Sequence, residues 1–118
     1  MKTHKDLEAW KNSINLITRV YQTTRNFPKE ELYGLTNQMR RSAVSIASNI
    51  AEGAARKTTK EFIHFLHIAR GSLAELETQL IVCQNLSLIT VETFKEYENE
   101  MKIIGAQLSG LLRSLKES

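Results

Sequence analysis

The sequence is poor in residues that cross-link or interrupt a polypeptide chain. Its 118 residues include one cysteine, one proline and five glycines. A single thiol, Cys83, cannot form an internal disulfide, and helix-breaking residues are scarce enough to allow long helices. No stretch shows the alternation of apolar and polar residues that is typical of a half-buried strand. The composition therefore predicts an all-α protein.

Long apolar runs are also missing. No run approaches the ~20 apolar residues that a membrane span requires. The longest charge-free stretch, residues 78–91, contains Gln, Asn, Ser and Thr. The opening residues, MKTHKDLEAW, have no apolar signal-peptide segment. We therefore expect a cytoplasmic protein with no membrane association, and the length suits one domain comprising residues 1–118.

Four segments have apolar residues at helical spacing. The first, residues 6–24, begins at Asp6 as a possible N-cap and ends before Pro28, and its seam is Leu7, Trp10, Ile14, Ile17 and Tyr21. The second has the stripe Leu35, Met39, Ala43, Ile46, Ile50 and Ala54. The third, residues 59–86, has Phe62, Leu66, Ala69, Leu73, Leu76, Leu80 and Cys83. The fourth follows Thr90 with Phe94, Tyr97, Met101, Ile104, Leu108, Leu111 and Leu115.

Heptad-type patterns with short connections predict an up-down-up-down four-helix bundle. Pro28 begins a short helical turn in the first connection. Gly53 is predicted to cap the end of the second helix, and Thr58 with Glu61 has the spacing of a capping box at the start of the third.

The second helix carries an unusual polar stripe beside its apolar one. Most of its side chains are short, whereas a merely solvated face would favour Lys and Glu. A comparable stripe follows the seam of the third helix. Together they predict a polar network within the subunit or between subunits, with the candidates Gln38, Ser45, Asn49, Glu52, Ser72, Glu75 and Gln79.

Positive charge is concentrated in the first part of the chain. The net charge is +3, but residues 1–70 carry 12 Lys/Arg and 6 Asp/Glu, whereas residues 71–118 carry 4 and 7. A basic surface suits nucleic-acid phosphates. The candidates are Arg40, Arg41, Arg56, Lys57, Lys60 and Arg70. The alternative is that Arg40 and Arg41 pair with carboxylates such as Glu52 or Glu75.

Enzymatic chemistry has little support in the sequence. A di-iron centre in a bundle needs two Glu-x-x-His pairs, and only Glu61 with His64 has that spacing. His64 and His67 lack a third ligand, so we expect a surface pair rather than a metal site. Cys83 lies on an apolar seam without a partnering base, and no phosphate-binding glycine loop is present. We therefore expect no metal, no cofactor and no catalytic residue.

Several motifs resemble the bacterial 23S rRNA intervening-sequence protein family. The matching motifs are Asp6-Leu7-x-x-Trp10, Phe27-Pro28-x-x-Glu31, Gln38-x-Arg40-Arg41-Ser42-x-x-Ser45-Ile46-x-x-Asn49-Ile50-Ala51-Glu52-Gly53, Glu61-Phe62-x-x-Phe65-Leu66-x-Ile68-Ala69 and Gly71-Ser72-x-x-Glu75-x-Glu77-Thr78-Gln79-Leu80. They cover nearly the whole chain, and the Ser-Asn-Ile-Ala-Glu-Gly block is the strongest. Ala47 departs from the pattern, which often has Pro there.

The resemblance implies a four-helix bundle that assembles into a ring-shaped homo-oligomer, a homopentamer, with a role in binding RNA. A related branch, the accessory proteins of diversity-generating retroelements, binds nucleic acid and a reverse transcriptase. The leading hypothesis is therefore a non-enzymatic oligomer that binds structured RNA through its basic surface. The alternative is a protein-interaction scaffold, such as an accessory subunit of a reverse transcriptase.

Overall fold

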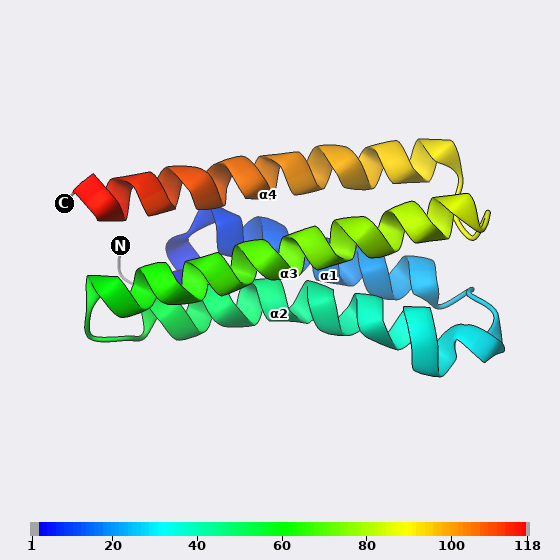
Figure 1. Ribbon diagram of the computed structural model, residues 1–118, viewed down its shortest axis with the longest axis horizontal. Helices are drawn as coiled ribbons and strands as arrows, with labels where there is room; N and C mark the ends of the chain where they lie inside the picture. The colour runs from blue at the N-terminus through cyan, green and yellow to red at the C-terminus, as the bar shows by residue number, and fades with distance from the viewer. Residues whose placement is uncertain (1–2, 118) are drawn as a thin grey trace.

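A computed structural model describes residues 3–117, and four long helices form most of it (Figure 1). They are α1 (Glu8–Thr24), α2 (Asn37–Ala54), α3 (Thr59–Asn85) and α4 (Val91–Glu117). Three short helical turns, η1 (His4–Asp6), η2 (Lys29–Glu31) and η3 (Leu32–Thr36), lie before α1 and between α1 and α2. The described residues contain no strand. Consecutive helices run in opposite directions, which confirms the predicted four-helix bundle.

The bundle is elongated, with principal extents of 46 × 24 × 19 Å. Its two ends bring together different parts of the chain (Figure 1). The start of α1, the α2–α3 turn and the end of α4 lie together, and we call this the turn end. The α1–α2 connection and the α3–α4 turn lie at the opposite end. Up-down topology thus makes neighbours of the start of α3 and the end of α4.

The core confirms most of the predicted seams. All seven seam residues of α3 are buried, as are Met39, Ala43, Ile46 and Ile50 of α2. In α4 the buried residues are Tyr97, Met101, Ile104, Leu108 and Leu112, while Phe94, Leu111 and Leu115 pack partly buried against them. Leu112 is the one buried residue of α4 outside the predicted seam.

The predicted seam of α1 is only partly correct. Leu7, Trp10 and Ile17 pack partly buried against the core, whereas Ile14 and Tyr21 are 38% and 40% exposed. The buried residues of α1 are instead Ala9, Ser13, Leu16, Val20 and Thr24. Two stripes overlap on this helix, and the one with small and hydroxyl side chains faces the core. Its two buried hydroxyls cost little because each donates to the backbone carbonyl four residues earlier, at 2.6 Å for Ser13 and 2.7 Å for Thr24.

Two helix starts are capped as the sequence predicts. The Thr58 hydroxyl accepts a hydrogen bond from the Glu61 backbone N–H at 3.1 Å, and Thr90 accepts one from Thr93 at 3.0 Å. Such bonds satisfy amide groups that the first turn of a helix leaves unpaired. Asp6, however, does not cap α1. It belongs to η1, where its carboxylate accepts a hydrogen bond from the Thr3 N–H.

Gly53 is needed for close packing rather than for capping. It lies inside α2, which continues to Ala54, and its φ is not positive. A Cβ at this position would lie 2.8 Å from Phe65 Cβ and 2.9 Å from Phe62 Cδ1. Glycine therefore lets α2 and α3 approach closely just before the turn that joins them.

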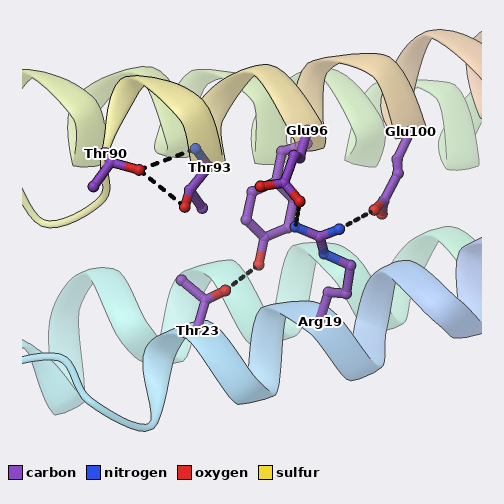
Figure 2. A network of polar contacts seen from close by, with 7 residues as sticks. Arg19, Thr23, Thr90, Thr93, Glu96 and Glu100 are labelled. Atoms are coloured by element: carbon purple, nitrogen blue, oxygen red, sulfur yellow. Dashed lines mark hydrogen bonds and ion pairs between the residues drawn. The ribbon is translucent and has the colours of Figure 1, made fainter.

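A polar seam joins α1 to α4 (Figure 2). The guanidinium of Arg19 contacts Glu100 at 2.6 Å and Glu96 at 3.4 Å, and it lies over the Tyr97 ring, 4.9 Å from the ring centroid. The Thr23 and Tyr97 hydroxyls are 2.5 Å apart. Burial raises the pKa of Glu100, and the nearby Arg19 partly offsets that rise. These specific contacts set the register of α4 on α1.

The connection between α1 and α2 is compact. Pro28 precedes the turn η2, as the sequence predicts, and η3 then leads directly into α2. Gly34 interrupts the helical geometry within η3, with φ −112° and ψ −108°. This bend lets the chain reverse direction and places Thr36 against the core, where it is 3% exposed.

Candidate nucleic-acid interface

Three of the predicted phosphate contacts lie in or beside the turn between α2 and α3. Arg56 and Lys57 follow the end of α2, and Lys60 lies in the first turn of α3; all three side chains are exposed. Arg56 is positioned by two contacts, an ion pair with Glu52 at 3.7 Å and a stacking contact over Phe65 at 4.9 Å. Lys57 and Lys60 form no ion pair with a described residue. The turn thus presents three cations with one partnering carboxylate.

The basic region continues along α3. Lys60, His64 and His67 follow at intervals of four and three residues, which places them on one face of the helix. Arg70 is one turn further on, and its Nη2 lies 3.3 Å from His67 Nδ1. The pKa of His67 is lowered by partial desolvation and by the positive charges of Lys116, Arg70 and His64. Lys116 of α4 therefore belongs to the same electrostatic environment.

We define the basic surface as the exposed side chains Arg56, Lys57, Lys60, His64, His67, Arg70 and Lys116. Four of these are sequence-predicted candidates, and His64, His67 and Lys116 are additions. Lys116 is far from the others in the chain, but the up-down topology places the end of α4 beside the start of α3 (Figure 1). Helical spacing alone could have added the two histidines.

Arg40 and Arg41 do not belong to this surface. Sixteen residues separate Arg40 from Arg56, which corresponds to roughly 24 Å along a helix axis. Arg40 contacts α1 instead, where its Nε donates to Thr24 Oγ1 at 2.9 Å. Neither arginine forms an ion pair with a described residue, so the expected partners Glu52 and Glu75 do not engage them.

Arg41 lines a polar groove between α2 and α3. The groove has a volume of about 410 Å³ and is lined by Gln38, Arg41, Ser42, Ser45, Ser72, Glu75 and Gln79. Five of the seven residues proposed for a polar network therefore line one groove. The remaining two lie further along α2, where Asn49 bonds to Ser45 and Glu52 bonds to Arg56.

Hydrogen bonds link part of the groove into a network. The Ser45 and Ser72 hydroxyls are 2.8 Å apart across the two helices. Asn49 Nδ2 donates to the Ser45 carbonyl at 2.8 Å and to its hydroxyl at 3.0 Å. The amide oxygen of Gln79 is buried and has no hydrogen-bond partner among the residues that the structure describes. A buried acceptor of this kind is costly unless a donor reaches it.

Reactive and metal-binding groups are sparse in the part of the chain that the structure describes. Within residues 3–117, no three His, Cys, Asp or Glu side chains converge on a point that could hold a metal ion. Cys83 is buried, with its Sγ 3.4 Å from Met39 Sδ. Burial, with a smaller contribution from Glu31, raises the pKa of the Cys83 thiol to about 11. The group is a neutral core side chain at physiological pH.

No helix within residues 3–117 has the length and apolar character required to cross a membrane. The fold and its surfaces define a helical-bundle protein with a basic turn end and a polar groove between two helices. The chain belongs to the 23S rRNA-intervening sequence protein family, whose model matches residues 5–110.

A solved structure supports the same fold. The chain is similar to a protein of unknown function from the S23 ribosomal protein family of Bacteroides thetaiotaomicron, with a TM-score of 0.82 and 24% sequence identity. The similarity covers 89% of this chain and 95% of the Bacteroides chain. A comparison with curated proteins gave no match.

Proposed function

We propose that the protein is a non-enzymatic, cytoplasmic nucleic-acid-binding protein whose ligand is structured RNA. The observation that carries this proposal is the basic surface at the turn end. Arg56 is the one Lys or Arg side chain of this surface that forms an ion pair with a described residue. The other four carry unpaired positive charges within residues 3–117, and they are Lys57, Lys60, Arg70 and Lys116. Such side chains attract phosphates and release condensed counterions on binding.

The composition of the surface favours recognition of phosphates rather than bases. Arg56 lies over the ring of Phe65 and His64 makes an edge contact with it, so this half-buried ring is a poor platform for stacking a base. Phosphate contacts determine position and affinity but carry little sequence information. An RNA helix, whose bases are stacked inside, presents mostly phosphates and 2′-hydroxyls. The family name, which refers to a ribosomal RNA insertion, is consistent with this ligand.

We further propose that the chain forms a ring-shaped homo-oligomer, a homopentamer, through the polar groove. The buried oxygen of Gln79 has no partner within residues 3–117, and Arg41 and Glu75 in this groove form no ion pair there. These groups favour a partner subunit that supplies both donors and acceptors. A ring would repeat the basic surface around its axis and raise affinity through multivalency. Substitution of Asn49 or Glu52 by Leu is expected to disturb assembly or solubility, and an unchanged oligomer with unchanged melting would count against this.

A protein-interaction scaffold is the alternative function. At the end of the bundle opposite the basic surface, Tyr33 is 90% exposed and the adjacent Leu32 is 45% exposed. Exposed aromatic residues are common anchors of protein interfaces. In this alternative the oligomer would recruit a nucleic-acid enzyme such as a reverse transcriptase, as in the accessory proteins of diversity-generating retroelements.

Binding across a salt series distinguishes the two functions. The ligands are a ribosomal RNA helix and an unrelated RNA duplex, and the mass of the oligomer is recorded on the same sample. We expect affinity to fall steeply with salt, because phosphate contacts release counterions. A preference for the ribosomal helix would add specificity. An intact oligomer that binds neither RNA at low salt would favour the scaffold.

A further inference from the structure

A small cationic pocket lies at the end of the bundle opposite the basic surface. It has a volume of about 190 Å³ and lies where α1 ends and α2 begins. Its polar and charged lining residues are Thr24, Arg25, Lys29, Thr36 and Arg40. No residue of the basic surface contributes to it. We call it the far pocket.

Arg40 is held rigidly in the far pocket. Its Nε donates to Thr24 Oγ1 at 2.9 Å, and its guanidinium lies 4.5 Å from the centroid of the Tyr21 ring. The Thr24 hydroxyl donates in turn to the Val20 carbonyl at 2.7 Å, so its lone pair faces Arg40. The two terminal nitrogens of Arg40 have no hydrogen-bond partner among the described residues. Arg40 is therefore a preorganised fork whose two terminal nitrogens are unused.

Thr36 supplies a second unused polar group. It is 3% exposed, it lines the far pocket, and its Oγ1 has no hydrogen-bond partner within residues 3–117. Buried hydroxyls nearly always have a partner. The Thr36 hydroxyl is thus an unused donor on a residue that lines the same pocket as Arg40.

The charge of the far pocket favours an anion. Arg25 and Lys29 are exposed residues that line it together with Arg40. None of the three forms an ion pair within residues 3–117. Glu30 and Glu31 follow Lys29 in η2, and neither pairs with these cations. Three positive charges thus surround one small volume without a paired carboxylate.

We propose that the far pocket binds a phosphate group. The volume is below the ~300 Å³ at which sites for drug-sized ligands begin, so it suits the phosphate itself better than a whole nucleotide. A guanidinium fork binds two phosphate oxygens at once, and a hydroxyl and an ammonium group complete the coordination. The phosphate is either that of a free phosphate monoester or the terminal phosphate of an RNA strand.

The test is an NMR titration of the isotope-labelled full-length protein with inorganic phosphate, with ionic strength held constant by chloride. We expect saturable shifts of the amide signals of residues 24–40. Arg40→Lys keeps the charge but loses the fork, and Thr36→Val keeps the shape but loses the hydroxyl. Each change should weaken phosphate binding at least tenfold. Arg70→Gln, which removes an arginine from the basic surface, should leave it unchanged.

The same spectra report whether each variant is folded. If Thr36→Val does not fold, the comparison of Arg40→Lys with wild type decides the test. Non-saturable shifts, or an equal loss of affinity in Arg70→Gln and Arg40→Lys, would overturn the proposal. A short RNA with a 5′-phosphate that shifts the same signals, where its 5′-hydroxyl form does not, would identify an RNA end as the source. If inorganic phosphate and a phosphate monoester bind, but the 5′-phosphate and 5′-hydroxyl RNAs behave alike, the natural ligand is the free phosphate monoester. Neither result depends on RNA binding at the basic surface.

Discussion

Replacement of Gly53 by alanine tests the packing that shapes the basic turn end. In an ordinary helix interior this change stabilises a protein by about 1 kcal/mol, because alanine has the higher helix propensity. At position 53 the added Cβ would lie 2.8 Å from Phe65 Cβ and 2.9 Å from Phe62 Cδ1, whereas real Cβ atoms essentially never come within 3.0 Å of another atom. Because the nearer contact is with a Cβ close to the backbone, a flexible side-chain end cannot relieve it. The helices must separate.

Overpacking of this kind typically costs about 1–3 kcal/mol. After subtraction of the ~1 kcal/mol gain in helix propensity, we expect Gly53→Ala to change stability by about 0–2 kcal/mol in the destabilising direction. Gly71 and Gly110 are matched controls, because a Cβ at either position meets nothing within 4 Å. Alanine there should stabilise by about 0.5–1 kcal/mol. Urea denaturation at several protein concentrations measures all three variants. If Gly53→Ala is as stable as Gly71→Ala, the close approach of α2 and α3 at Gly53 does not limit the side chain there.

Three further substitutions test individual contacts by urea denaturation. Thr58→Ala removes the N-cap of α3 and should cost ~1 kcal/mol; an unchanged stability would mean that the cap contributes nothing. Tyr97→Phe removes the hydroxyl that contacts Thr23 and should cost ~0.5–1.5 kcal/mol, and a gain in stability would contradict this. Burial, opposed by Arg19, raises the pKa of Glu100 in the folded protein. Wild type should therefore lose stability relative to Glu100→Gln as the pH rises above the ordinary carboxyl pKa of 4.5, and the opposite slope would exclude the raised pKa.

The sequence predicted the helices well because each carries a periodic apolar pattern. α3 was predicted most completely, since its seam is one continuous stripe of buried apolar residues from Phe62 to Cys83. The seam of α1 was predicted only in part, because two stripes overlap on this helix. The small and polar residues Ala9 and Ser13 face the core, while the larger Ile14 is 38% exposed. The size of side chain that fits at a close contact between two helices depends on the neighbouring helix. The periodicity of one segment does not show which helix lies beside it.

The candidate site shows a similar division. Residues close in sequence, such as Arg56, Lys57 and Lys60, were correctly expected at one exposed corner. Lys116 was missed because only the three-dimensional arrangement brings α4 beside α3. Arg40 was grouped with the others on charge alone, but its position early in α2 places it in a different pocket. Charge type is readable from sequence, whereas the grouping of charges depends on topology.

The most direct test of the proposed function compares two charge reversals of equal size. The first double variant, Lys57→Glu/Lys60→Glu, reverses two charges on the basic surface. The second, Lys95→Glu/Lys102→Glu, reverses two charges at exposed positions of α4 outside that surface. RNA affinity is measured for both variants and wild type across a salt series, with oligomer mass as the control for folding. We expect the first variant to lose at least tenfold in affinity and to reduce the salt slope by about 2, while the second stays close to wild type. Equal losses in both variants, or none in either, would contradict RNA binding at the turn end.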